Sequence, residues 1–161
     1  MSEIKEESGV LIIGLGNDYR SDDGIGLYVS RCIEQNVIRG VSVINGISDG
    51  TSLLDYWDGK DHVILIDAVS PNQSPGYLYK FDGLSENISE DLFTAFSTHS
   101  LNIQETIKLG KALGKLPQKL TIYGIEGEKF KPGNKLSKTV ETSAKKLIME
   151  IIETLKVNKD A

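Results

Sequence analysis

The sequence VLIIGLGNDYRSDDGIG, residues 10–26, places a glycine-rich turn directly after an apolar strand and an acidic pair directly after the turn. A turn of this kind is typical of dinucleotide-binding proteins, in which a third glycine completes the fingerprint that binds the pyrophosphate. Here Tyr19 stands where the third glycine is needed, and Asp22 and Asp23 occupy the start of the following helix. Because carboxylates at this place repel phosphate, the motif favours a cation over a nucleotide and speaks against a nucleotide-dependent oxidoreductase.

Composition limits the kind of protein this can be. The 161 residues suffice for one domain with a sizeable core, so we predict a single domain over residues 1–161, with residues 1–8 and 157–161 as flexible ends. The net charge of −5 and the scattered lysines do not give the clustered basic face of a nucleic-acid-binding protein. Cys32 is the only cysteine, which excludes an intrachain disulfide and fits a reducing cytoplasm. No stretch approaches the roughly 20 apolar residues of a membrane span, and the N-terminus does not resemble a signal peptide. We therefore expect a cytoplasmic monomer without nucleic-acid or membrane partners.

Apolar runs rich in valine and isoleucine predict an α/β sandwich. They are too uniformly hydrophobic for strands with one solvated face, and they lie at residues 10–15, 41–44, 63–66 and 120–125. Helical spacing predicts a helix over 24–35 and a last helix over 138–155, with Ser137 as its cap. A further helix is expected to turn its apolar stripe toward the sheet, and this stripe consists of Leu109, Ala112, Leu113 and Leu116.

The short segment after Val69 determines the direction of the next strand and the edge of the sheet at which His99 lies. The next strand, residues 77–81, follows too soon for a parallel crossover, so it is predicted to run antiparallel. A short helix within residues 85–96 then brings His99 to the opposite edge of the sheet, before a helix that begins near Ser100. Asp23 and Asp67 are expected at the same edge, where open α/β sheets place their sites.

Three motifs together resemble those of the hydrogenase maturation endopeptidases, a family that trims the C-terminal tail from the large subunit of nickel-iron hydrogenases after nickel insertion. The motifs are GLGNDYRSDDGIG at 14–26, VILIDAV at 63–69 and STHSL at 97–101, and the similarity extends over roughly residues 9–155. The resemblance implies an α/β fold of the phosphorylase/hydrolase-like type, a three-layer α/β/α sandwich. Its five-stranded mixed sheet is expected in the order 2-1-3-5-4, with strand four antiparallel.

The resemblance also implies the chemistry of the site. Asp23, Asp67 and His99 correspond to the family's metal-binding triad and are expected to be both metal ligands and catalytic residues. Nickel is expected to arrive with the substrate, the hydrogenase large-subunit precursor, and other divalent ions to occupy the site in the isolated protein. No serine or cysteine stands beside a base, so attack by water would need the metal to polarise the carbonyl or to activate the water. Both a catalytic role of nickel and a role in recognition alone remain open.

Other interpretations of these residues involve no catalysis. Asp22 is interpreted as a helix-start carboxylate, His62 as a hydrogen-bonded structural residue and Cys32 as part of the core. A non-proteolytic metal- or peptide-binding module on the same fold is the alternative to a protease. The segment Asn45-Gly46-Ile47-Ser48 stands where the family often has Asp-Gly-Gly-Thr, so an acidic group is absent and the substrate preference stays open. Residues 127–135 are expected to form an exposed basic loop.

Overall fold

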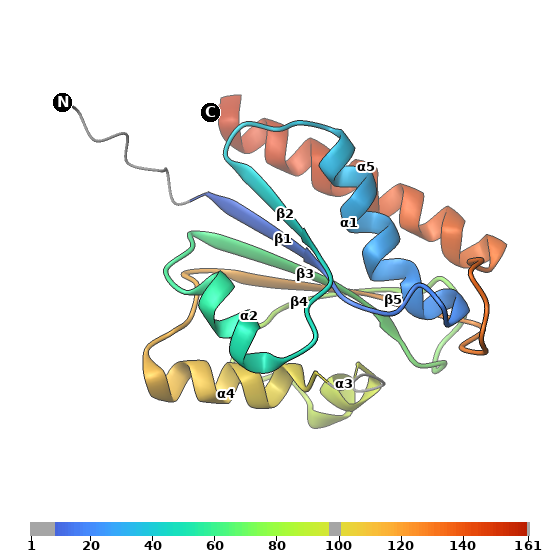
Figure 1. The fold of residues 1–161 in the computed structure, drawn as a ribbon, viewed down its shortest axis with the longest axis horizontal. Helices are drawn as coiled ribbons and strands as arrows, with labels where there is room; N and C mark the ends of the chain where they lie inside the picture. Colours follow the sequence, from blue (N-terminus) through green and yellow to red (C-terminus); the bar gives the residue numbers. More distant parts are fainter. Residues whose placement is uncertain (1–8, 97–100, 161) are drawn as a thin grey trace.

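The computed structural model describes residues 9–96 and 101–160, which form a five-stranded mixed β-sheet between two layers of helices (Figure 1). The strands are β1 (Val10–Gly14), β2 (Val41–Asn45), β3 (His62–Val69), β4 (Leu78–Asp82) and β5 (Leu120–Glu126). They lie in the order β2-β1-β3-β5-β4, and β4 runs antiparallel to β5 while the other neighbours are parallel. The predicted strand order and the antiparallel fourth strand are confirmed.

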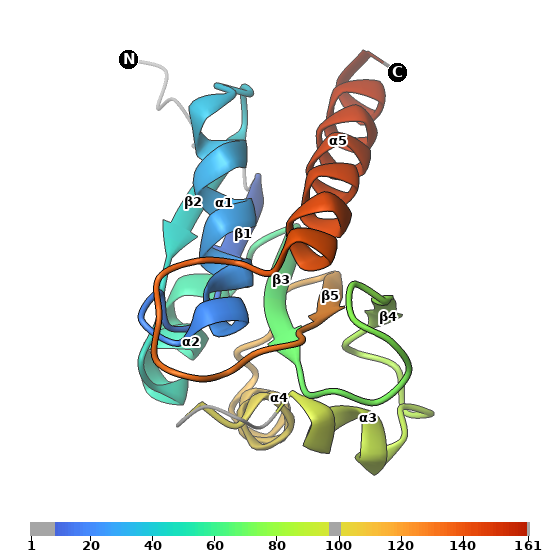
Figure 2. The same ribbon diagram turned by 90° about the vertical axis from the view of Figure 1, so that its right-hand side faces the viewer.

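Helices cover both faces of this sheet. The elements are the 3₁₀ turn η1 (Ser21–Gly24) and the helices α1 (Ile25–Gln35), α2 (Gly50–Trp57), α3 (Glu90–Ala95), α4 (Ile103–Leu113) and α5 (Lys138–Asp160). Helices α1 and α5 lie side by side on one face, and α2, α3 and α4 lie on the other (Figures 1 and 2). Alternate strand residues supply the two cores, with Ile12 and Ile64 in the core on the α1 and α5 side and Ile13 and Leu65 in the other. The uniformly apolar strands therefore reflect a sheet that is buried on both faces.

Helix α5 buries the stripe that its sequence predicts. The buried positions include Val140, Ala144, Leu147, Ile151 and Leu155. On the outer side Lys145 lies 3.6 Å from the carboxylate of Glu141, one helical turn away. Ser137 precedes the helix as a cap residue would, and its hydroxyl donates to the carboxylate of Asp22.

Helix α4 turns a different face to the sheet from the one predicted. Leu109 and Leu113, which were expected inside, are 47% and 57% exposed. The positions that are buried are Ile103, Thr106 and Gly110. A side chain at Gly110 would collide with Leu54 of α2, so the helix makes its close approach at a residue that contributes nothing to an apolar pattern. The leucine stripe was therefore the wrong guide to the orientation of this helix.

The start of α4 also differs from the prediction. The helix begins at Ile103 rather than near Ser100, and Asn102 is its N-cap, with its side-chain oxygen accepting from the N–H of Glu105 at 3.1 Å. An asparagine at this position satisfies one of the free N–H groups of the first turn, which explains the later start. In the part of the chain that the structure describes, no helix combines the length and the apolar character that a membrane span needs.

Candidate functional site

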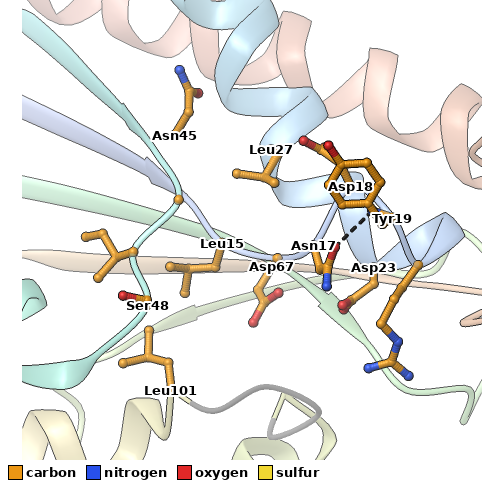
Figure 3. A pocket seen from close by; sticks show the side chains of 14 residues that line it. Leu15, Asn17, Asp18, Tyr19, Asp23, Leu27, Asn45, Ser48, Asp67 and Leu101 are labelled. Carbon is orange, nitrogen blue, oxygen red and sulfur yellow. Dashed lines mark hydrogen bonds between the residues drawn. The ribbon is translucent and has the colours of Figure 1, made fainter. Parts of the chain in front are cut away.

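An open pocket of ≈ 630 Å³ lies at the carboxyl edge of the parallel strands (Figure 3). Its walls come from the turn after β1, the start of α1, the segment after β2, the end of β3 and the residue Leu101 just before α4. Asp23 and Asp67 both line it. Two of the three predicted site residues, 44 positions apart in a 161-residue chain by their numbers 23 and 67, thus share one pocket.

The turn after β1 holds Asp23 against the end of the strand. Gly16 has a φ of +134°, and a side chain there would collide with the backbone carbonyl of Asp23. The N–H of Asn17 donates to the same carbonyl at 3.1 Å, and the Asn17 side chain accepts from the N–H of Tyr19 at 2.9 Å. Gly26 of α1 likewise lies against the backbone carbonyls of Leu15, just after β1, and Ile66 in β3, which a side chain would not permit. The glycines of the motif therefore bring the chain close to itself and place Asp23 beside the sheet.

Asp67 lies in β3, one residue beyond the end of β1. Gly14, the last residue of β1, pairs with Ile66, and the N–H of Leu15 donates to the Ile66 carbonyl at 2.9 Å. At Asp67 the pairing with β1 has ended, while β5 still pairs through Gly124, so the β1 side of Asp67 is open to the pocket. The Asp67 carboxylate accepts from the N–H of Ala68 at 2.8 Å, and Figure 3 shows it turned, like that of Asp23, toward the same part of the pocket.

Burial gives these two carboxylates their chemical character. Asp23 is 0% exposed and Asp67 is 1% exposed. Since ionised carboxylates lose hydration when they are buried, two of them at one pocket favour a cation or hydrogen-bond donors between them. Asp18 lines the same pocket but is partly exposed, and its carboxylate accepts from both terminal nitrogens of Arg31, at 2.9 and 2.7 Å. Asp23 and Asp67 are therefore the buried acids of the pocket that point to cation binding.

His99, the third predicted ligand, lies outside the described residues. Leu101, two positions further along the sequence, lines the pocket. Within residues 9–96 and 101–160, no three histidine, cysteine, aspartate or glutamate side chains lie close enough together to hold a metal. The structure thus places two members of the predicted triad, and the ligand assignment stays a prediction.

Asp22 has a structural environment that differs sharply from that of its neighbour. Its buried carboxylate accepts from the N–H groups of Glu128, Lys129 and Ser137 and from the Ser137 hydroxyl, at 2.7 to 2.8 Å. Burial alone would raise the pKa of Asp22, but the hydrogen bonds from Lys129, Ser137 and Glu128 outweigh it and lower the pKa below its ordinary value. Asp22 thus has a structural environment, but its carboxylate binds residues 128–137 and does not cap the helix start that the sequence suggested.

The segment that departs from the family pattern forms one wall of the pocket. Asn45 accepts from the hydroxyl of Ser30 at 2.6 Å and donates to the carboxylate of Glu34 at 2.7 Å, so its amide is engaged with α1. The N–H of Gly46 donates to the carbonyl of Gly14 at 2.8 Å, which keeps this turn against the end of β1. The turn is thus present with an amide where the family often has an acid.

Several pocket residues carried no signal in the sequence. Tyr19 is 80% exposed at the pocket, and Arg20, Ser48 and Leu101 also line it. An aromatic residue in a glycine-rich turn is a weak clue to a binding surface, and the others depend on how distant segments meet. The Ser48 hydroxyl lies 3.5 Å from the carboxylate of Asp49, which caps α2.

Two residues interpreted as structural lie away from this pocket. His62 Nε2 lies 2.8 Å from the Thr121 hydroxyl, and burial, followed by the positive charges of Lys119 and Lys80, lowers its pKa. Cys32 is partly buried and packs against the core on the α1 and α5 side. Neither residue lines the pocket of Asp23 and Asp67.

Comparison with known proteins gives this fold and pocket a family. The family model for hydrogenase maturation proteases matches residues 27–154, which include Asp67 and the position of His99 and begin shortly after Asp23. The hydrogenase 2 maturation protease of Escherichia coli (strain K12) is 29% identical over 151 residues, covering 91% of this chain and 90% of that protein. The structure of the hydrogenase maturating endopeptidase HybD from E. coli superposes with a TM-score of 0.79 at 26% identity and covers 93% of both chains. The NiFe hydrogenase maturation protease HybD from Thermococcus kodakarensis gives a TM-score of 0.66 at 26% identity, covering 91% of this chain and 98% of that one.

The match extends over most of the chain and agrees with the fold. The protein therefore belongs to the hydrogenase maturation protease family and is an endopeptidase. The resemblance found in the three sequence motifs, and the class of enzyme that it implies, are confirmed.

Proposed function

We propose that this protein removes the C-terminal extension of the large-subunit precursor of a nickel-iron hydrogenase after nickel insertion, and that it recognises the nickel that the precursor carries. The observation that carries the proposal is the pair of buried carboxylates, Asp23 and Asp67, at one open pocket of a hydrogenase maturation protease. In this proposal nickel is part of the substrate. Asp23, Asp67 and His99 complete its coordination shell when the precursor docks.

The donor set fits a divalent ion. Two carboxylates and one imidazole, with no thiolate, form a hard to borderline set that does not select nickel by affinity alone. Selectivity then comes from the cysteines of the precursor that already hold the metal. A bound divalent ion supplies polarisation of the scissile carbonyl or activation of a water molecule.

The residues of this chain position the two carboxylates and form the walls of the pocket. The turn at Gly16 fixes Asp23, and Asp67 is fixed by its place in β3, just beyond the end of β1. Both carboxylates are therefore held in position before the substrate arrives. The pocket is open, and Tyr19 stands exposed at its margin, which suits a protein substrate better than a small enclosed ligand. The peptide to be cut is therefore proposed to enter along the edge formed by the turn after β1 and the segment after β2.

Precursor processing tests this function directly. The protein is incubated with nickel-loaded and with nickel-free large-subunit precursor, and the mass of the precursor is measured over time. We expect loss of the C-terminal extension from the nickel-loaded form only. Equal processing of both forms would contradict nickel recognition, and no processing of either would contradict the assignment of the substrate.

Charge-removing variants test the two carboxylates. Asp23→Asn and Asp67→Asn keep the side-chain shape and remove the charge, so we expect processing to fall at least a hundredfold, by analogy with the loss of a group that contributes about 3 kcal/mol to the transition state. Asp55→Asn is the matched control, because Asp55 forms only an exposed pair with Lys115 at 3.5 Å. Normal processing by either pocket variant would remove that residue from the site.

A further inference from the structure

Asp22 and Asp23 are adjacent in sequence, but their carboxylates lie on different sides of η1. Asp23 lines the pocket, whereas Asp22 is absent from its walls and is 0% exposed. Residues 127–137, which we call the strap, lead from β5 to α5 and pass the start of α1 in Figure 2. The donors to Asp22 all belong to the strap.

The strap is bound to the residues before Asp23 along its whole length. Four donors at 2.7 to 2.8 Å converge on the Asp22 carboxylate: Oδ2 accepts from Glu128, Lys129 and the Ser137 hydroxyl, and Oδ1 accepts from the N–H of Ser137. Backbone bonds continue the attachment: the N–H of Asp22 donates to Lys129, that of Ser21 donates to Gly133, and that of Gly133 donates to Tyr19. The exposed basic loop of the sequence prediction is thus fixed at one edge by a buried acid.

The strap also contacts β3, the strand that carries Asp67. At its beginning the N–H of Gly127 donates to the carbonyl of Val69 at 3.0 Å, two residues after Asp67 in β3. The same segment therefore contacts the turn that carries Asp23 and the strand that carries Asp67. The strap therefore links η1, which carries Asp23, to β3, which carries Asp67.

The turn that carries Asp23 needs such support. It is a 3₁₀ turn of four residues, Ser21–Gly24, without a side-chain hydrogen bond at its N-cap. Ser21 has a φ of +54°, a left-handed conformation that a non-glycine residue keeps only where its surroundings hold it. The bonds to the strap therefore add to the bond from Asn17 to the Asp23 carbonyl in holding the turn in place.

We propose that Asp22 is a positioning residue, which holds the strap on η1 and thereby fixes Asp23 relative to Asp67. This inference rests on the proposed function. It assigns to Asp22 a role in the reaction that acts through Asp23 and requires no contact between Asp22 and the substrate.

The test compares Asp22→Asn, Ser137→Ala and Leu155→Ala at a temperature at which circular dichroism shows all three folded. Asparagine keeps the shape of Asp22 but turns N–H groups toward backbone N–H donors, so at least one bond to the strap is lost. Ser137→Ala removes a single donor. Leu155 is buried at the far end of α5 and serves as a control for lost stability alone.

For Asp22→Asn we expect kcat on nickel-loaded precursor to fall at least tenfold with a change in KM below twofold, because the substrate surface is kept while the carboxylate beside it shifts. Binding of Cd²⁺ to the enzyme alone, measured by titration calorimetry, should weaken at least threefold. Ser137→Ala should change both quantities in the same direction by a smaller factor, and it carries the test if Asp22→Asn does not fold. Leu155→Ala should change neither.

Three results would overturn the positioning role: wild-type kcat in folded Asp22→Asn, a loss that appears in KM alone, or an equal loss of kcat in Leu155→Ala. In each of these cases the wild-type enzyme cuts the precursor and the proposed function stands. If the wild-type enzyme does not cut the precursor, the proposed function fails and the inference fails with it.

Discussion

Replacing Gly16 with alanine tests whether the glycine turn after β1 holds Asp23 in position. At a φ of +134° an L side chain is strained, which costs about 1 to 3 kcal/mol. The new Cβ would also collide with the backbone carbonyl of Asp23, which cannot rotate away as a side chain can. Overpacking of this kind costs roughly 1 to 3 kcal/mol. We therefore expect Gly16→Ala to lower the free energy of unfolding by roughly 2 to 6 kcal/mol, a large part of the stability of an ordinary domain.

Gly114→Ala provides the matched control. Gly114 ends α4 with a φ of +68°, and nothing lies within 4 Å of the position that its Cβ would occupy. It therefore carries the backbone strain without the collision, and about 1 to 2 kcal/mol is expected. Both variants are measured by urea unfolding followed by circular dichroism, with wild-type m-values as evidence that the same surface is exposed.

The activity of folded Gly16→Ala completes the test. A displaced Asp23 carbonyl also loses the bond from Asn17, so the turn and its carboxylate move together. We expect precursor processing to fall more than tenfold at a temperature at which the variant is folded, while Gly114→Ala processes normally. The reasoning is refuted if Gly16→Ala costs no more stability than Gly114→Ala, or if it is destabilised and still cuts at the wild-type rate.

Three further predictions concern residues outside the pocket. Burial lowers the pKa of His62 in the folded state. The contribution of His62 to stability is therefore complete above its unfolded pKa of about 6.5 and is lost as the pH falls through the folded pKa. In urea unfolding, His62→Gln should lose less stability than the wild type between about pH 7.5 and 5.5. Cys32→Ala should cost about 1 kcal/mol of stability and leave processing unchanged, and a folded but inactive variant would require a thiol mechanism. Leu109→Gln should change stability by less than about 0.5 kcal/mol, whereas Ile103→Ala should cost roughly 2 to 5 kcal/mol, and the reverse order would restore the orientation of α4 that the sequence predicted.

The sheet was predictable because its signals are local. Strands that are buried on both faces read as continuous apolar runs, and the short connection after Val69 excludes a parallel crossover. The same holds for α5, in which a regular stripe from Val140 to Leu155 is buried as its spacing predicts. In these elements the residues that form the pattern are also the residues that make the contacts.

Helix α4 shows where such reasoning fails. Gly110, which an apolar pattern does not register, is buried, and a side chain there would collide with Leu116, Lys115 and Leu54, while Leu109 and Leu113 are about half exposed. Small residues permit close approach, and the approach then decides which face is buried. Hydrophobic periodicity therefore identified the helix and misidentified its inner face.

The sequence predicted the shared location of Asp23 and Asp67 but not the contacts that hold the turn of Asp23. Asp23 and Asp67 were expected at one edge of the sheet from the position of each at the end or start of an element, and one pocket contains both. The contacts that hold the Asp23 turn come from the strap, more than 100 positions later in the sequence. No local pattern predicts that the N–H groups of Glu128 and Ser137 meet on one carboxylate.

The geometry of η1 explains why the two neighbouring acids have different surroundings. In a 3₁₀ turn there are about three residues per turn, so adjacent side chains point roughly 120° apart. With the pocket on one side of η1 and the strap on another, two neighbouring aspartates must face different surroundings. One carboxylate is left to serve the pocket and the other is consumed by four donors from the strap. The chemistry of the two residues is identical, and the different directions of adjacent side chains place one carboxylate at the pocket and the other against the strap.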